Sequence, residues 1–369
     1  MANILYSSIF GDLTRMVQAR FDAASKLNKD LFDQVIFEDY MDWDTPSVGL
    51  SFEELIGSYG ITIAAPTIGD NSKEAILPTE GLATLSEKVL KHALTLPMTI
   101  QDYRKVLQLL DSKSIADDTK KRQLVDLMWG NVQTVVNGVL AKIDMIFLGG
   151  LSNEGTFTFN TTNNPEGGVK ATINYNQPAS NIATSTTAWT AANLATVDCF
   201  EDIQAILDAA QDNVEIAKIM CAPALISYMC KSANVHKMIW GNDAASKIVR
   251  LADLNEYMQS NDLPVFVPIR RKVRVMDGKT ISTITPWVTA NMVFVPDGKL
   301  GIIKNAYADS ELRQEPGVTY SNFNRIRVSQ WGVGETQGSN GVEFTKAESL
   351  SLPVFTEMNG IYTLKTQYA

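Results

Sequence analysis

Histidine is nearly absent from this sequence: only His92 and His236 occur among 369 residues. Histidine is the usual general acid or base and metal ligand near neutral pH. His236 lies six residues from Cys230 with no second pair nearby, so a zinc site is not expected. Cys199, Cys221 and Cys230 form no C-x-x-C motif, and we expect reduced, buried thiols of an intracellular protein.

Motifs of catalysis and nucleotide binding are also lacking. The sequence has no G-x-S-x-G nucleophile motif. A phosphate-binding loop would need glycine five residues before Gly278, where Val273 stands. Gly332–Gly341 lacks the helix start and the ribose-binding acid of a dinucleotide site. We therefore expect no catalytic residues, no cofactor and no metal, and the protein is predicted not to be an enzyme.

Positive charge is in short supply as well. The net charge is -9, from 32 basic and 41 acidic residues, so tight binding to nucleic acid is not expected. No hydrophobic run approaches the ~20 residues of a membrane-spanning helix, and no basic residue precedes Arg15, as a secretory signal would require. We predict no membrane contact.

The N-terminal third alternates between helical and extended patterns. Residues 11–40 have helical spacing, whereas 41–60, broken by Asp, Pro and Gly, are predicted to be an extended arm on a neighbouring surface. Two extended runs, ITIAAPTI and LATLSEKVLKHALTL, flank a polar tip within 61–98 and predict a long hairpin. A hairpin alone is marginal in water, so this one needs its own domain or another subunit to lie on.

The middle of the chain predicts one long helix over 117–148, ended by Gly149-Gly150, with two helices broken at Gly130 or Gly138 as the alternative. A hairpin over 155–175 and a polar loop over 176–192 follow.

From 193 to 305, helix and strand patterns alternate, which predicts a compact α/β domain. Expected helices cover 198–210, 222–231 and 245–259; expected strands cover 214–220, 265–267, 272–276, 292–295 and 301–304, the last two joined by Asp297-Gly298. Strand patterns at 325–330, 342–355 and 361–366 need partners, and the long helix is expected to cover them in a domain that is discontinuous in sequence.

One basic cluster stands out, formed by Arg270, Arg271, Lys272 and Arg274. Such a run usually marks a solvated face. The sharper alternative is a salt-bridged contact with an acidic stretch of a neighbouring subunit, such as the one with Asp42 and Asp44 or Glu53-Glu54. Reversing Arg271 and Lys272 to Glu is then expected to impair assembly.

The order of these pieces resembles the major capsid protein of tailed bacteriophages, with the Hong Kong 97-like fold, and most of all its phage-lambda-type branch. The most specific segments are NMVFVPDGKLGIIKNAYADSEL (291–312), RIRVSQW (325–331) and GVEFTKAESLSLPVFTEMNGIYTLKT (341–366). They are similar to the strands that leave that family's A domain and to its closing P-domain strands.

The resemblance implies an α+β fold with an N-terminal arm (1–60) and an E-loop hairpin (61–98) lying across the adjacent subunit. It further implies a P domain (99–192, with the spine helix at 117–148, and 306–369) and an A domain (193–305) near the five- and sixfold axes. Lys73, Glu74, Lys88 and Lys91 join the acidic and basic residues above as candidates for contacts between subunits.

The implied function is that of a structural subunit that self-assembles into pentamers and hexamers of an icosahedral phage head enclosing double-stranded DNA. The expected partners are other copies of the chain, a separate scaffolding protein, a portal, decoration or head-completion proteins, and DNA held by weak unspecific contact. The expected location is the virion, assembled in the host cytoplasm. An encapsulin-type nanocompartment shell protein and a soluble α/β hydrolase with an appended β domain remain alternatives.

Overall fold

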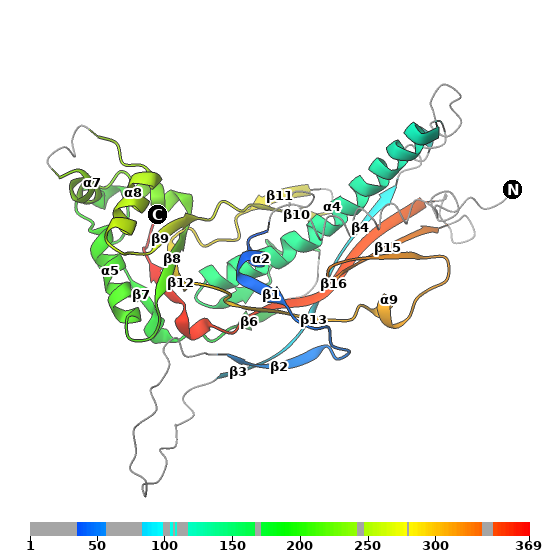
Figure 1. Cartoon of the computed structure of the whole chain (residues 1–369), viewed down its shortest axis with the longest axis horizontal. Helices are drawn as coiled ribbons and strands as arrows, with labels where there is room; N and C mark the ends of the chain where they lie inside the picture. The colour runs from blue at the N-terminus through cyan, green and yellow to red at the C-terminus, as the bar shows by residue number, and fades with distance from the viewer. Residues whose placement is uncertain are drawn as a thin grey trace, which may run out of the picture.

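A long helix lying on a mostly antiparallel sheet, with an α/β body at one end, forms the molecule (Figure 1). The computed structural model describes residues 35–56, 83–98, 104, 105, 108, 117–166, 171–241, 247–278, 280–333 and 342–369. Two hydrophobic cores lie within these residues, one under the long helix and one inside the α/β body. The predicted mixed helix-and-strand architecture is confirmed.

The long helix is α4, Asp117–Ser152, a single element of 36 residues. One continuous helix is confirmed, but its predicted end at Gly149-Gly150 is wrong. A Cβ on Gly149 would lie 2.6 Å from the ring of Phe157, and one on Gly150 would lie 2.8 Å from the ring of Tyr175. These glycines lie within the helix and let the rings of Phe157 and Tyr175 pack close against it; they do not end it.

A six-stranded sheet lies under α4. Its path is β1 (Met41–Trp43), β13 (Gly301–Ala306), β16 (Val342–Phe355), β15 (Ile326–Val333) and β14 (Thr319–Phe323), with β4 (Leu90–Met98) also paired to β16. Ala347 on β16 stands opposite Leu94 on β4 and Val328 on β15, and this row belongs to the core under the helix. The short helix α9 (Asp309–Leu312) follows β13.

The hairpin predicted over 61–98 is paired differently. β2 (Ser51–Ile56) pairs with β3 (Ala83–Lys88), so the paired base includes residues predicted to belong to the arm. β4, predicted as part of the hairpin, pairs along β16 instead. β1 pairs in parallel with β13 of its own chain, so residues 41–43 of the predicted arm lie on their own subunit. Most of helix 11–40 and the hairpin tip lie outside the described residues; α2 (Phe37–Tyr40) is helical as predicted.

The α/β body contains a second, five-stranded sheet. Its order is β7 (Ile182–Thr184), β17 (Tyr362–Lys365), β12 (Asn291–Pro296), β8 (Ile216–Cys221) and β9 (Val265–Pro268). Four helices pack with it: α5 (Cys199–Ala210), α6 (Pro223–Met229), α7 (Ala233–Trp240) and α8 (Leu251–Ser260). The helices expected from 198 and 222 are confirmed, the first capped by the Asp198 side chain; α7 and β7 were not predicted.

Two strand assignments within this body are corrected. β12 and β13 form no hairpin, because β12 lies in the five-stranded sheet and β13 in the other. All but the last residue of β12 are buried, as expected of a central strand, and the chain crosses between sheets after it. β17, expected among the closing strands under the helix, also lies in the α/β body, where Tyr362 and Leu364 join its core.

The remaining elements are short and peripheral. They are β5 (Thr156–Thr158) paired with β6 (Thr172–Asn174) as the predicted hairpin, β10 (Val273–Asp277) paired with β11 (Thr280–Ile284), and the 3-10 turns η2 (Ala179–Asn181), η3 (Ala191–Asn193) and η6 (Met358–Gly360).

Part of α4, Gly130–Ser152, is long and apolar enough to cross a membrane, which was not expected from the sequence. The window that passes this test is 72% buried inside the protein. A core helix of this length has the same composition, and the burial of α4 accounts for its hydropathy.

Two glycine substitutions test the close packing. A Cβ on Gly301 would overlap the Val354 carbonyl oxygen and lie 2.9 Å from Phe355 Cα, so Gly301→Ala must displace backbone and should cost about 3 kcal/mol of unfolding free energy. Gly130→Ala meets nothing within 4 Å and should gain up to about 1 kcal/mol in helix propensity. Urea unfolding of unassembled subunits measures both, and equal stabilities would contradict the packing.

Candidate subunit-contact site

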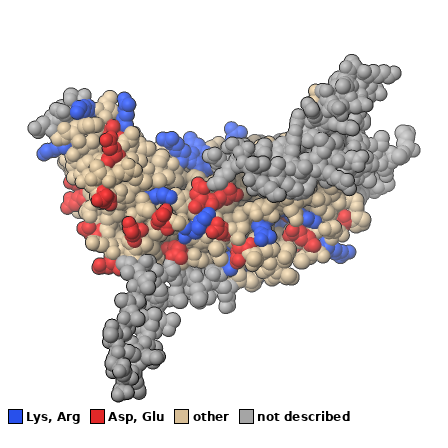
Figure 2. Space-filling view, viewed as in Figure 1, with Lys and Arg blue, Asp and Glu red and all other residues tan. Residues whose placement is uncertain are grey.

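The basic cluster lies where the chain passes from β9 into β10. Arg270, Lys272 and Arg274 are exposed, and none has an ion-pair partner among the described residues. Arg271 alone turns inward, where its Nε lies 3.0 Å from Asp144 Oδ2 on α4. Figure 2 shows basic side chains gathered at this edge, above a face with more acidic groups. The cluster therefore has one structural member and three that are available to another molecule.

Asp144 joins three segments of the chain. Its side chain is fully buried, and Oδ1 accepts the backbone N–H groups of Ile36 at 2.9 Å and Phe37 at 3.1 Å. Burial raises the pKa of Asp144 to about 6, although the Arg271 charge and the two amides oppose this shift. The carboxylate thus fixes α2 and the Arg271 segment to α4. Asp144 was not predicted as a functional residue; the available signal was an acid between Ile143 and Met145 in an apolar helix.

The acids of the predicted arm are already paired within their own chain. Asp42 lies 3.1 Å from Lys299 Nζ, and Asp44 lies 2.7 Å from Lys304 Nζ. The hydrogen bond from Lys304 holds the pKa of Asp44 below its ordinary value, against the effect of burial. Both pairs follow from the parallel pairing of β1 with β13. An arginine of a neighbour would compete with these lysines, so a contact between subunits at this point stays a prediction.

Lys91 belongs to a charge network around the buried Glu348, on the sheet face away from α4. Its Nζ lies 3.2 Å from Glu348 Oε2 and 3.3 Å from Asp309 Oδ2, and Lys346 contacts the same Glu348 oxygen. Burial alone would raise the pKa of Glu348, but Lys346, Lys91 and the Ser310 hydroxyl together hold it below its ordinary value. Glu348 is only 1% exposed, so the network fastens β16 to β4 and α9.

The other candidates are placed as follows. Lys88 is exposed at the end of β3. Lys73 and Glu74 lie outside the described residues. The structure therefore brings Asp42, Asp44, Lys91 and Arg271 into contacts within the chain and leaves Lys88, Arg270, Lys272 and Arg274 exposed.

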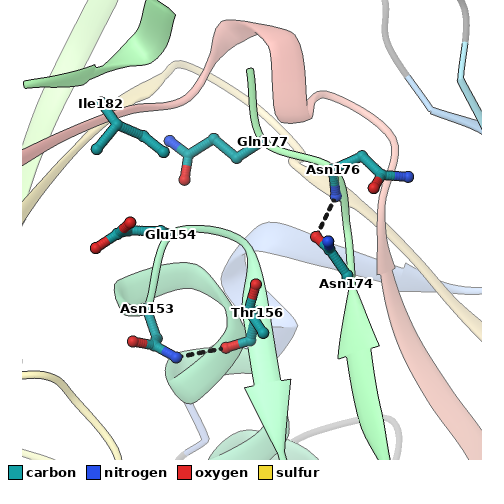
Figure 3. Close-up of a pocket in the computed structure, with 7 residues that line it drawn as sticks. All are labelled: Asn153, Glu154, Thr156, Asn174, Asn176, Gln177 and Ile182. Atoms are coloured by element: carbon teal, nitrogen blue, oxygen red, sulfur yellow. Dashed lines mark hydrogen bonds between the residues drawn. The ribbon is translucent and has the colours of Figure 1, made fainter. Parts of the chain in front are cut away.

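A polar hollow of about 430 Å³ lies where α4 ends (Figure 3). Asn153, Glu154, Asn174 and Gln177 belong to its lining. Its polar groups are largely occupied: Asn153 Nδ2 donates to the Thr156 carbonyl, Asn174 Oδ1 accepts the Asn176 N–H, and Glu154 pairs with Lys365 at 2.8 Å. With one neutralised carboxylate, the hollow has no evident catalytic or metal-binding chemistry.

His92, Cys199 and Cys221 are buried and have structural roles. His92 is buried with Nε2 3.1 Å from the Ser351 carbonyl oxygen, and burial, aided by the Lys142 charge, lowers its pKa to about 4. Burial raises the pKa of the Cys199 and Cys221 thiols to about 12, which makes them poor nucleophiles. Within the described part of the chain, no three His, Cys, Asp or Glu residues come together as a metal site.

The described fold joins a long helix on a sheet to an α/β body, and comparison with known proteins identifies the family. Residues 95–366 match the model of phage major capsid protein E, so the chain belongs to that family. It is a structural subunit of a phage capsid, a protein of the virion that associates with copies of itself.

Solved structures share this fold at low sequence identity. A prophage protein of E. coli CFT073 described as a capsid protein superposes with a TM-score of 0.58 at 13% identity, covering 96% of this chain and 98% of that one. A phage-related protein from Bordetella bronchiseptica RB50 gives 0.51 at 12% identity, covering 96% of each chain. No curated protein sequence matches significantly. The expected Hong Kong 97-like fold is confirmed.

The buried Asp144 predicts a specific pH dependence of the unfolding free energy. The pKa of Asp144 is higher in the folded than in the unfolded protein, so protonation of this carboxylate stabilises the fold. This stabilisation is lost as the pH rises from about 4 to about 6. Asp144→Asn keeps an oxygen acceptor but cannot titrate. The stability of wild type relative to the variant should therefore fall by up to roughly 3 kcal/mol over this range. Urea unfolding at several pH values measures it, and parallel pH profiles for the two proteins would refute the assignment.

The Glu348 network predicts unequal costs for its two carboxylates. Glu348→Gln should lose about 2–3 kcal/mol of unfolding free energy, less than for a fully buried pair because Lys91 and Lys346 reach water. Asp309→Asn is the matched control, because that side chain is 81% exposed and should cost under about 0.5 kcal/mol. Urea midpoints give both values; a larger loss for Asp309→Asn would reverse the assigned roles.

Proposed function

We propose that this chain forms the pentamers and hexamers of an icosahedral phage head enclosing double-stranded DNA, and that its subunits meet head to tail through opposite edges. The observation that carries this proposal is the β2–β3 ribbon, which is incomplete as part of a single subunit. The ribbon forms a sheet of its own and pairs with no other described strand. Two strands alone are marginally stable in water, so the ribbon needs a surface to lie on.

The described residues supply little of that surface. At the base of the ribbon, Phe52 packs against a small cluster of Val89, Ala306, Ala308 and Leu350, and the Val89 N–H bonds the Leu50 carbonyl. Beyond Ile56 and before Ala83, the connection of 26 residues lies outside the described part. A neighbouring subunit is the natural support for the ribbon and for this connection, which includes Lys73 and Glu74.

Exposed apolar side chains occur at both edges. Near the ribbon, Val48 is 70% and Leu50 is 48% exposed. On the β10–β11 hairpin, Met276 and Ile281 stand opposite each other and are 46% and 63% exposed. The ribbon and this hairpin lie at opposite edges of the molecule (Figure 1). A ring built by rotation brings opposite edges together, as a closed capsomer requires.

The charged residues at the two edges also fit a head-to-tail contact between subunits. Lys272 and Arg274 lie on the β10 face that carries Met276, because alternate residues of a strand share a face. Lys88 is exposed at the end of β3 on the ribbon. We assign Lys88, Arg270, Lys272 and Arg274 to contacts between subunits, with Glu53-Glu54 of the neighbour as a candidate acidic partner. Reversing Lys272 and Arg274 is a cleaner test than reversing Arg271, whose loss would leave the buried Asp144 unpaired.

The proposed domain roles follow the strand pairing. The ribbon and its connection serve as the E-loop, α4 and its sheet as the P domain, and the α/β body as the A domain around the five- and sixfold axes. Compared with the boundaries expected from sequence, residues 51–56 move to the E-loop, β4 and β13 to the P domain, and β7 and β17 to the A domain.

The proposed partners extend beyond copies of this chain. A separate scaffolding protein, a portal and decoration or head-completion proteins would act with it during assembly in the host cytoplasm. Packaged DNA would make weak, unspecific contact, because the chain carries a net charge of -9. The subunit would have no catalytic role of its own.

Electron microscopy of the concentrated, purified protein tests this function. Wild type should form closed shells. A variant in which residues 57–82 are replaced by a short Gly-Ser turn should keep the thermal unfolding of the subunit body but form no shells. The ribbon base stays in the variant, so lost assembly with unchanged unfolding isolates the contribution of the connection.

The contents of the shells separate the remaining alternatives. Double-stranded DNA in particles made during infection fits a phage head, whereas an enzyme cargo would indicate an encapsulin-type compartment. A stable monomer at all concentrations, or unimpaired assembly of the deletion variant, would overturn the proposal.

A further inference from the structure

A largely apolar hollow of about 300 Å³ opens on the surface of the α/β body, between α5, α7 and α8. These helices lie at the end of the molecule opposite the N-terminal end of α4 (Figure 1). Phe200 and Tyr257, whose ring centroids are 5.2 Å apart, belong to the lining, together with Met238, which is 46% exposed. A hollow of this kind can receive one aliphatic side chain from another molecule.

The charge at this hollow is negative. Asp198 and Glu201 belong to its lining, and the described part of the lining contains no basic side chain. Asp198 Oδ1 already accepts the N–H groups of Phe200 and Glu201, both at 3.1 Å, as the cap of α5. Glu201 is exposed and has no ion-pair partner among the described residues. The hollow therefore suits an aliphatic side chain that is accompanied by a cation.

The α/β body itself presents such a side chain. Ile248, just before α8, is 76% exposed, so the hollow of its own chain does not hold it. Arg250, two residues later, is exposed and has no ion-pair partner within the described part of the chain. Lys247 is placed differently, because its Nζ lies 4.6 Å from the ring centroid of Trp240 in the same chain. Ile248 and Arg250 thus match the hollow in both apolarity and charge.

Ile248 and the hollow lie toward opposite ends of α8. Ile248 precedes the helix, whereas Tyr257 lies in its last turn and Leu263 follows it. The helical rise from Leu251 to Tyr257 alone is roughly 9 Å. A protrusion and a matching hollow at separate positions can join copies head to tail, as in a ring, or reciprocally, as in a two-fold dimer. A pentamer or hexamer requires the first arrangement.

We propose that Ile248 of each subunit inserts into the hollow between α5, α7 and α8 of the next copy in the ring, where Arg250 pairs with Glu201 of that copy. This contact rests on the proposed function, since it joins the α/β bodies of one capsomer around its axis. It uses residues other than those of the ribbon and of the β10–β11 hairpin, so it adds a second, separate contact between the same two subunits.

Disulfide trapping tests the insertion. Ile248→Cys/Met238→Cys places one thiol on the protruding segment and one at the hollow, and oxidation of assembled shells should join neighbouring subunits. Denaturing electrophoresis without reductant should then show a ladder of products that ends at pentamers and hexamers. Each single variant, Ile248→Cys or Met238→Cys, lacks one of the two thiols and should give only monomer.

The other outcomes of the trapping experiment separate this contact from the proposed function. A product that stops at dimers would show reciprocal pairing, and a disulfide within single chains would show that a subunit fills its own hollow. Unlinked monomer from oxidised shells of the double variant would show that the two positions do not meet. Each of these results overturns the insertion and leaves the phage-head function standing. Failure of the wild type to form shells would overturn the proposed function and the insertion with it.

Shell yields of substituted proteins give an independent measurement. Glu201→Arg or Arg250→Glu alone should lower the yield about tenfold, because like charges then meet across the contact, and the two changes together should restore most of it. Both side chains are exposed, so thermal unfolding of the unassembled subunit should change little. Ile248→Leu keeps an aliphatic side chain and should assemble like wild type, whereas Ile248→Asp should not. Unimpaired assembly of Ile248→Asp, or no rescue by the double reversal, would contradict the contact.

Discussion

The close approach of α4 to the sheet beneath it is the constraint on which the rest of the structure depends. At Gly138 a Cβ would lie 2.5 Å from Leu94, and at Gly150 a Cβ would meet Tyr175 and Phe355. The helix can therefore approach the sheet this closely only because these two positions have no side chain. Ala347, fully buried on β16, provides the matching small residue on the sheet. Alternation along β16 then places Lys346 and Glu348 on the opposite face, where they form the charge network with Lys91.

Buried carboxylates connect this rigid body to segments from other parts of the chain. Asp144 binds α2 and Arg271, and Glu348 binds Lys91 of β4 and Ser310 of α9. In each case a fully or almost fully buried acid contacts a partner more than 30 residues away in sequence. Among the described basic residues without an ion-pair partner, Arg270, Lys272 and Arg274 lie together at one edge, opposite the ribbon. The interior thus uses carboxylates to fix the fold, and unpaired cations remain at a surface suited to a neighbouring subunit.

The sequence predicted the elements with strong local signals and failed where pairing is non-local. The apolar periodicity of α4 and the helical pattern over 198–210 are local signals, and both helices are confirmed; the structure adds that Asp198 caps the second. The Asp297-Gly298 turn predicted a hairpin, yet the chain changes sheets there, since which partner β12 finds depends on β8 and β17. Gly149 was misread because a glycine that permits close packing and one that ends a helix look alike in sequence. Asp144 was missed because its partners, Ile36 and Arg271, are more than 100 residues away on either side.

The way the chain crosses between its two sheets bears on how such a subunit can form a closed shell. It passes from the α/β body to the helix-covered sheet after Pro296 and returns between Phe355 and Tyr362. Val293 and Val295 of β12 belong to the core under the helix, while Met292 and Phe294 belong to the other core, so one central strand serves both. Such shared strands resist hinge motion between the two bodies, because bending would break both cores at once. In the proposed pentamers and hexamers, the geometric differences between subunit positions would then be absorbed outside this unit, for example by the β2–β3 ribbon.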